Sequence, residues 1–527
     1  METASPPAPL ARGESSQRKE TPGETSTWLV ALVACAIGVA LQCGLSPLAD
    51  PDLPSHLALG EWIVQHRTVP FEEPFAWTRA GEPFFAYSWL AQLSFFLLLR
   101  ATGPLGLHLL AAGTGAAIVL ASAAAGRAMG LRASVSVVFG VASALVALDA
   151  TPFLRPQLFL HILVPLSWFY VARYRREGFQ SRGTLVGLFA VNALAANLHI
   201  TFPVMAAPLV PLLLLDEQAR HSRRAWLVVP AVLLGWACSP YALAWIEVFR
   251  LNFAPNAITK PPAPTGELTP GFLASPVLGI ALASLPVVAL TVFRRERERL
   301  LYGAMWLAGL VLFARIFKGL GPWWWCSIPL AVAALTRVPR ASGQGTRRAF
   351  ASLLALFVIA TAITNMQLLP LVSRLEGDAT TRTLPSIKAF ASEPAARWLE
   401  HNTREDVRGR ALTVFNYGSY LGWRLPRFSM SVDGRTIFPD SAALPDAIGE
   451  RGVAYYGPYQ SAELAIVPLT YPVSARLDAD TAWMRVGAAE PAQWAPRAPR
   501  AGLWVRRGWW ARARTATAAL PSDGVLR

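Results

Sequence analysis

Long apolar runs alternate with short arginine-rich segments along the first 375 residues. A membrane-spanning helix needs roughly 17 to 25 mostly apolar residues. Runs of this kind lie near 27–46, 104–126, 133–150, 157–172, 225–247, 271–293, 300–317, 321–337 and 350–372. The pattern predicts a mostly α, polytopic bundle of membrane helices over residues 27–375.

Two other apolar stretches need separate treatment. The stretch 183–216 is too long for one ordinary span, and it contains Asn197, His199 and Pro203. Arginines on both sides of it favour the cytoplasm, so we expect two short helices and an even number of crossings. The stretch 84–99 is short, and counting it as a span would move later arginine clusters outside. We therefore predict an interfacial helix at 84–99 within a first outer loop, 47–103, and about eleven spans in all.

The composition agrees with a membrane protein. Hydrophobic residues make up 53% of the chain and charged residues 15%, with a mean hydropathy of +0.36, so the charges are too few to cover a soluble protein of this length. The net charge of +15 would suggest nucleic acid in a soluble protein. Here the arginines gather between spans, as the positive-inside rule requires, so we expect membrane lipids and no nucleic acid as partners.

The two ends of the chain differ from the apolar part. Residues 1–26 are rich in Pro, Ser, Thr, Glu and Gly, which predicts a disordered cytoplasmic tail. From residue 376 the apolar runs shorten, and strand-like segments at 411–415 and 464–467 alternate with a helix-like one at 394–401. The sequence predicts a C-terminal extracytoplasmic α/β domain over 376–527 on a bacterial cytoplasmic membrane protein.

The first outer loop contains an acidic cluster with a histidine. Asp50, Asp52, His56 and Glu73 are its candidates for chemistry. Two carboxylates two residues apart can supply a general base or hold a divalent metal. They can equally cap the helix that starts near Ser55, and a single histidine is often structural. These alternatives remain open on spacing alone.

Several polar residues lie at the same predicted side of the membrane. Arg155, Arg315 and Lys318 stand at outer ends of spans, where a cation can bind a phosphate group. Asn197 and His199 lie at another outer turn, where they can support such a site. The simpler interpretation is that the cations reach for the interface and that Asn197 and His199 hold two helices together.

Several motifs carry a family resemblance in order. They are Asp50 to Leu53, His56 and Leu57, Gly60 to Ile63, Pro70, Glu73 to Phe75, Thr78, Gly81, Pro83, and Trp89 with Leu90. This pattern resembles the first loop of bacterial polytopic proteins related to the GT-C glycosyltransferases, which include protein O-mannosyltransferase-like and aminoarabinose transferase-like families. Further similar segments lie at 155–159, 197–199, 239–241, 416–421 and 432–435.

The resemblance implies an activity. It implies catalysis on the outer face of the membrane, a polyprenyl-phosphate sugar donor and a first-loop acid as the base, with Asp52 the first choice. The leading hypothesis is transfer of a sugar to a lipid, glycan or protein acceptor. A non-catalytic scaffold or envelope-assembly protein with the same fold is the alternative. A transporter fits less well, because span centres hold few charges and no inverted repeat is evident.

Overall fold

The structure, a computed structural model, describes most of the apolar part and most of the C-terminal part of the chain. The described residues are 22–46, 48, 50, 52–151, 154–253, 296–315, 320–336, 392–431, 457–489 and 500–526. The predicted spans 271–293 and 350–372 and the segment 432–435 lie outside them. The predicted disordered tail is corrected at one point, because helix α1 begins at Pro22, and proline favours the first turn of a helix.

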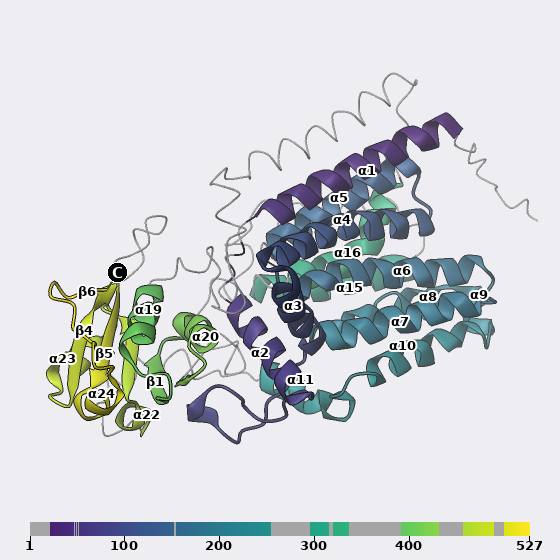
Figure 1. Cartoon of the computed structure of the whole chain (residues 1–527). Helices are drawn as coiled ribbons and strands as arrows, with labels where there is room; N and C mark the ends of the chain where they lie inside the picture. Colours follow the sequence, from purple (N-terminus) through teal and green to yellow (C-terminus); the bar gives the residue numbers. More distant parts are fainter. Residues whose placement is uncertain are drawn as a thin grey trace, which may run out of the picture.

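The apolar part consists of helices that lie side by side in a bundle (Figure 1). They are α1 (Pro22–Leu45), α2 (Leu53–His66), α3 (Trp89–Thr102), α4 (Pro104–Ala128), α5 (Ala133–Ala150), α6 (Leu160–Arg176), α7 (Arg182–Leu198), α8 (Leu209–Leu215), α9 (Glu217–His221), α10 (Val228–Ala237), α11 (Trp245–Phe253), α15 (Glu296–Arg315) and α16 (Leu320–Leu335). Helices α2 and α3 lie at the end of the bundle that faces the C-terminal sheet.

Among the described residues, three helices are long and apolar enough to cross a membrane. They are Ser26–Leu45, Pro104–Ala128 and Ala133–Ala150. The run predicted as one span at 225–247 is not a straight helix, because Ala225–Ala237 and Ala242–Arg250 meet at 99°. The break contains Pro240, which cannot donate a backbone hydrogen bond. The protein is a multi-pass membrane protein, and the count of eleven spans stays a prediction.

The stretches 183–216 and 84–99, which were treated separately from the other apolar runs, fold largely as the sequence suggests. Helix α7 ends at Leu198, and the chain resumes as a 3-10 turn at Phe202–Ala206 followed by α8. The predicted helix at 84–99 was wrong at its start, because α3 begins at Trp89 after a turn at 87–88. Its 14 residues reach about 21 Å, less than the roughly 30 Å of a bilayer core.

Glycines allow the closest helix contacts. A Cβ added at Gly60 of α2 would lie 2.3 Å from the carbonyl oxygen of Gln92 in α3. A Cβ at Gly115 of α4 would lie 2.7 Å from the Cys43 sulfur in α1. Small residues at such crossings let membrane helices pack backbone to backbone. The α2–α3 pair is therefore held at one fixed separation.

A six-stranded sheet forms the C-terminal part. Its strands are β1 (Gly409–Thr413), β2 (Phe428–Met430), β3 (Leu464–Pro468), β4 (Trp483–Ala489), β5 (Ala501–Arg506) and β6 (Val525–Leu526), in the order β2-β1-β3-β5-β4-β6. Strands β2, β1 and β3 are parallel, β5 is antiparallel to β3 and β4, and β6 is parallel to β4. The segment predicted as a strand at 464–467 lies within β3, whereas the one at 411–415 overlaps β1 only at 411–413, because Phe415 begins α20.

Helices accompany these strands. They are α19 (Glu393–Asn402), α20 (Phe415–Arg424), α22 (Gly457–Ser461), α23 (Pro472–Ala479) and α24 (Arg507–Ala513). Helix α19 contains the helical segment predicted at 394–401. In Figure 1, α20 lies between the sheet and α2. The sheet and these helices are called the C-terminal sheet region below.

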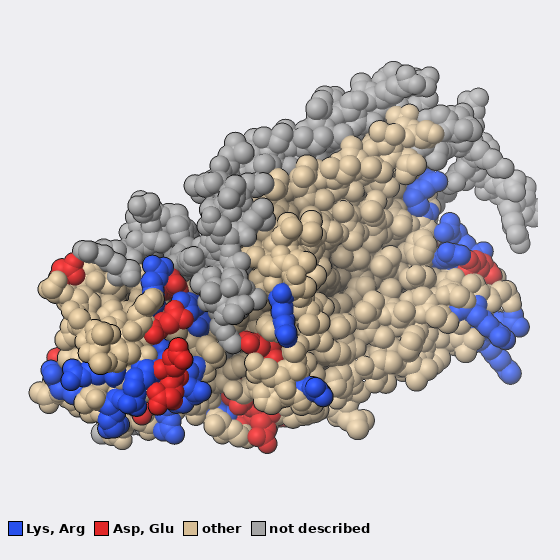
Figure 2. Space-filling view, viewed as in Figure 1, with Lys and Arg blue, Asp and Glu red and all other residues tan. Residues whose placement is uncertain are grey.

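Charged side chains gather at two ends of the molecule. Figure 2 shows Lys and Arg at the end of the bundle where α9 lies and over the C-terminal sheet region, with mostly uncharged surface between. The last turn of α6 contributes Arg173, Arg175 and Arg176 to the first of these ends. This distribution suits a bundle that crosses a membrane with its sheet region at one face.

Candidate functional site

The start of α2 and the turn after α5 meet in an ion-pair network. The Arg155 Nε donates to Asp50 Oδ2 at 2.9 Å, and its Nη2 donates to Asp50 Oδ1 at 2.7 Å. The same Nη2 lies 3.1 Å from Asp52 Oδ2. Two neighbouring carboxylates thus share one guanidinium, and the contact with Asp50 has the bidentate geometry that strengthens such pairs.

The two acids differ in accessibility. The Asp50 side chain is 1% exposed and also accepts the backbone N–H of Asp52 at 3.1 Å. The Asp52 side chain is 25% exposed. Although Asp52 stands at the N-cap of α2, its carboxylate accepts no capping hydrogen bond. The capping alternative therefore does not account for the Asp52 carboxylate, which faces Arg155 instead.

His56 lies one helical turn beyond Asp52 on α2. Its Nδ1 is 3.3 Å from the side-chain nitrogen of Gln92, and its ring meets Phe95 edge to face at 6.1 Å. Both partners belong to α3, so His56 ties α2 to the next helix. Sequence reasoning did not select Gln92, and its only signal was a polar residue within an apolar helix.

Glu73 has local contacts within the first loop. Its side chain is buried, and its Oε1 accepts the backbone N–H groups of Phe75 and Ala76 at 2.8 and 2.9 Å. These bonds form the turn that carries the chain toward the C-terminal sheet region. The contacts of Glu73 are those of a residue that stabilises the conformation of the loop.

Asn197 and His199 stand at the end of α7. The Asn197 oxygen accepts from Trp89 Nε1 at 2.7 Å, and its nitrogen lies 3.3 Å from the Cys238 carbonyl oxygen. Asn197 thereby connects the start of α3 with the ends of α7 and α10. His199 Nδ1 lies 2.8 Å from Thr201 Oγ1, and its ring meets Tyr87 edge to face at 6.2 Å. Both residues contact the segment that joins the first loop to α3, Asn197 through Trp89 and His199 through Tyr87.

The remaining two predicted phosphate ligands are not placed. Arg315 ends α15, and its side chain is not among the described atoms, while Lys318 lies outside the described residues. Their roles stay predictions. The described part of the site consists of Asp50, Asp52 and Arg155.

Tyr241 holds the two ends of the first loop together. Its hydroxyl donates to the Pro70 carbonyl oxygen at 2.9 Å and accepts the Ala86 N–H at 3.1 Å. A bridge between Glu72 and Pro83 closes the same loop. The motif at 239–241 was noted in the sequence, but no pattern could show which backbone groups the hydroxyl binds.

The tip of the first loop docks on the C-terminal sheet region. Trp77 Nε1 donates to the Ala411 carbonyl oxygen at 3.3 Å, and Thr78 Oγ1 donates to the Ser431 carbonyl oxygen. Ala76 forms a parallel bridge with Met430 at the edge strand β2. These bonds tie the loop to strands more than 330 residues further along the chain.

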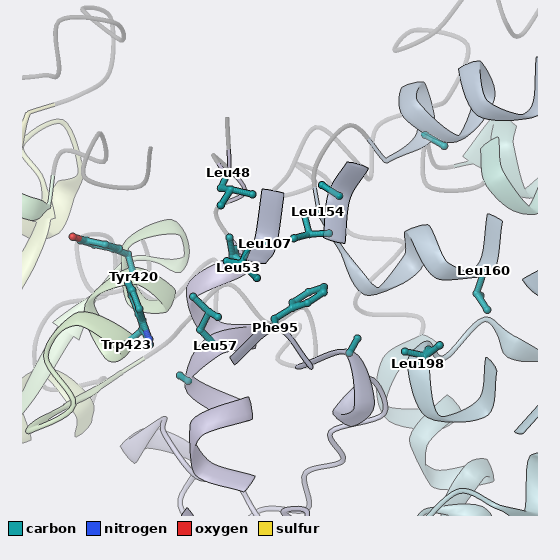
Figure 3. Close-up of a cluster of buried hydrophobic side chains, with 14 of the residues drawn as sticks. Leu48, Leu53, Leu57, Phe95, Leu107, Leu154, Leu160, Leu198, Tyr420 and Trp423 are labelled. Carbon is teal, nitrogen blue, oxygen red and sulfur yellow. The ribbon is translucent and has the colours of Figure 1, made fainter. Parts of the chain in front are cut away.

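Helix α20 covers α2 from the other side. Leu53 and Leu57 of α2 and Tyr420 and Trp423 of α20 are all at most 1% exposed, and they belong to one apolar cluster (Figure 3). The sheet region therefore packs directly on α2, the helix that begins one residue after Asp52.

An ion-pair network secures α20 to α19. The Tyr420 hydroxyl donates to Glu393, and Arg424 Nη1 donates to Glu400 Oε1 at 2.9 Å. The Arg424 guanidinium lowers the pKa of Glu400, chiefly through these hydrogen bonds. The helix that covers α2 is thus held by charge as well as by packing.

Asp50 and Asp52 were the candidates for holding a divalent metal. Within the described part of the chain, no three His, Cys, Asp or Glu residues lie close enough together to hold one. Both carboxylates lie against the Arg155 guanidinium. A metal at Asp50 and Asp52 stays a prediction.

Comparisons with known proteins find likeness in structure only. No protein-family model matches the chain, and no curated protein sequence matches it. The cryo-EM structure of arabinofuranosyltransferase AftD from mycobacteria matches with a TM-score of 0.54 and 18% identity, covering 91% of this chain and 40% of that one. This chain thus spans well under half the length of AftD.

Two further solved structures give TM-scores of 0.49. The oligosaccharyltransferase of Archaeoglobus fulgidus is 12% identical, with 85% of this chain and 69% of that chain covered. ArnT from Cupriavidus metallidurans, bound to undecaprenyl phosphate, is 14% identical, with 94% and 100% covered. The likeness to AftD covers 91% of this chain, and the protein shares the fold of that structure.

Proposed function

We propose that this protein is a membrane glycosyltransferase that moves a sugar from a polyprenyl-phosphate donor to an acceptor hydroxyl of a lipid, glycan or protein on the outer face of the cytoplasmic membrane. One observation carries the proposal. A buried Asp50–Arg155 pair holds the more exposed carboxylate of Asp52 at the start of α2. The fold shared with AftD and the resemblance of the first loop support it.

Asp52 is the proposed general base. The acceptor oxygen attacks the anomeric carbon of the donor sugar, its proton passes to the Asp52 carboxylate, and the bond from the anomeric carbon to the phosphate oxygen breaks. Coulomb attraction to Arg155 favours the ionised carboxylate, which is the form that accepts a proton. Its 25% exposure gives an acceptor access that Asp50 does not offer.

Arg155 is the proposed ligand of the departing phosphate. A guanidinium engages phosphate oxygens with several donors at once, and it stabilises the charge that develops as the sugar leaves. Asp50 is then a positioning residue, since it holds Arg155 through two hydrogen bonds. His56 and Glu73 serve the site by fixing α2 and the loop, and Arg315 and Lys318 are further candidates for the phosphate.

The test is the conservative substitution Asp52→Asn. We expect the rate of sugar transfer to fall by about 100-fold or more, because general-base catalysis contributes about 10² to 10⁴. The product is measured by mass spectrometry of glycolipids and glycans from membranes that contain the variant as their only source of the protein.

Asp149→Asn is the matched control. Asp149 is an exposed acid at the end of α5, on the same predicted side as Arg155. We expect this variant to keep wild-type product levels. Wild-type levels in Asp52→Asn would contradict the assignment of Asp52 as the general base.

A further inference from the structure

A pocket of about 680 Å³ opens at the far end of α2, away from Asp52. It lies between the end of α2, the start of α3 and the break after α10, and its lining includes Ile63, Val64, Arg67, Trp89, Leu93 and Pro240. Its size falls within the roughly 300–1,000 Å³ of ordinary ligand pockets. None of these residues belongs to the proposed catalytic group.

The walls of the pocket are mostly apolar. A few residues beyond Pro240, two large apolar side chains project outward, Leu243 at 105% exposure and Ile246 at 86%. In a membrane protein such side chains face lipid rather than water. The apolar lining of the pocket is therefore followed in the chain by side chains suited to contact with lipid.

Arg67 is the single cation among the described residues that line the pocket. Its side chain is exposed, and within the described part of the chain only its backbone N–H forms a hydrogen bond, to the Ile63 carbonyl oxygen. Its backbone has φ of 55°, the left-handed conformation that glycine usually takes where a helix ends. An arginine here sets a fixed positive charge at the mouth of an apolar cavity, which is complementary to an anionic lipid head group.

The length of α2 separates the Arg67 charge from the proposed catalytic residues at the start of the helix. Arg67 stands at the C-cap position and Asp52 at the N-cap position of a 14-residue helix, so the two lie about 20 Å apart. An anion bound at Arg67 is then too far away to be the phosphate that leaves at Arg155. The pocket must serve a lipid other than the sugar donor.

We infer that this pocket binds the acceptor, and that the acceptor is an anionic lipid. Its acyl chain fills the pocket, its phosphate or carboxylate pairs with Arg67, and the rest of its head group extends toward Asp52. The role of the lipid as acceptor rests on the proposed function. Binding of an anionic lipid in the pocket does not depend on catalysis.

The experiment measures lipid binding without any sugar donor. The full-length protein is reconstituted in phosphatidylcholine nanodiscs with a small fraction of phosphatidylglycerol that carries a photoreactive acyl chain. After illumination, crosslinks are mapped by mass spectrometry. We expect crosslinks at 63–69 and 237–240, and we expect much weaker labelling there by a photoreactive phosphatidylcholine.

Arg67→Asn removes the charge, and asparagine tolerates the left-handed backbone. We expect it to lower phosphatidylglycerol labelling of the pocket about tenfold, the value of one charge-assisted hydrogen bond. Arg100→Asn is the matched control, since Arg100 is an exposed arginine of α3 that does not line the pocket. It should label as the wild type does. Val64→Trp fills the pocket and should reduce labelling by both lipids.

Two results would overturn the inference. Equal labelling by the two phospholipids, unchanged in Arg67→Asn, would mean that the pocket holds ordinary membrane lipid. Displacement of the probe by undecaprenyl phosphate at equal concentration would mean that the pocket belongs to the donor. Neither result depends on Asp52→Asn, so failure of the proposed catalytic role is recognised separately.

Discussion

Arg155 is held in place by two carboxylates from a segment more than 100 residues earlier. Burial of an unpaired carboxylate costs several kcal/mol, and a close guanidinium with good geometry offsets that cost. Asp50, at 1% exposure, depends on this contact. The pair therefore fixes the turn after α5 against the start of α2. This contact also sets the position of the Asp52 carboxylate, which lies beside the same guanidinium.

The substitution Asp50→Asn tests this dependence. We expect it to lower the free energy of unfolding by about 3 kcal/mol or more, because removing one partner leaves a buried charge poorly compensated. The measurement is chemical denaturation in detergent micelles. Glu82→Gln, which breaks the exposed Arg79–Glu82 pair, should cost less than about 1 kcal/mol. Equal stability of the two variants would mean that Asp50 is not structurally required.

At the scale of single residues, the sequence predicted which side chains matter better than it predicted their partners. Topology and resemblance put Asp50, Asp52 and Arg155 at one face, and the structure brings all three together. The contacts of Gln92 and Tyr241 were not predictable, because a hydrogen-bond partner depends on how each helix is rotated about its axis. Hydropathy carries no information on that rotation.

Helices α2 and α3 act as a pair because of one glycine. A Cβ at Gly60 would overlap the backbone of α3 at Gln92. The same pair contains His56 and its partner Gln92 and forms two walls of the pocket near Arg67. A change in the separation of the two helices would therefore alter both the contact between His56 and Gln92 and the pocket near Arg67.

We expect Gly60→Ala to destabilise the protein by about 1–3 kcal/mol, since it forces two packed backbones apart. Gly113→Ala is the matched control, a helical glycine of α4 whose added Cβ would meet nothing within 4 Å. That variant should be neutral or more stable by up to about 1 kcal/mol, because alanine favours the helix. Thermal unfolding in detergent compares the two. A Gly60→Ala protein as stable as Gly113→Ala would show that the helices can separate freely.

Element boundaries followed the sequence where hydropathy alone decides them. Helix α5 occupies the predicted span at 133–150. The start of α3 and the bend after α10 did not follow it, because both depend on contacts from elsewhere in the fold. Ala86 donates its backbone N–H to the Tyr241 hydroxyl, and its carbonyl oxygen accepts the Trp89 N–H in the turn that precedes α3. Pro240 marked a weak point in the sequence, yet a 99° turn is a property of the packed structure.

At the scale of the whole molecule, the arrangement of charge predicts which parts face the cytoplasm. The loop between α6 and α7 follows the arginines at the end of α6, and the first loop contacts the C-terminal sheet region. The positive-inside rule puts these two loops on opposite sides of the membrane. The mostly uncharged surface between the two ends in Figure 2 agrees with that separation.

Cysteine labelling tests this topology in intact cells. Ala80→Cys, at the exposed tip of the first loop, should react with a membrane-impermeant maleimide added outside. Gln180→Cys, exposed between α6 and α7, should react only after the membrane is permeabilised. Each is compared with the wild-type protein, which has four cysteines of its own. Labelling of Gln180→Cys from outside would mean that α3 crosses the membrane after all.

The bond between Trp77 and Ala411 also has a consequence for biosynthesis. Its two partners are separated by 334 residues, which a ribosome adds in roughly 20 to 60 s at 5–20 residues per second. During that interval the acidic loop has already been made, but the strands and helix that cover it do not yet exist. The first loop is thus among the earliest parts synthesised and among the last to be completed, so a chain that stops before residue 411 would lack a finished site however well its helices insert.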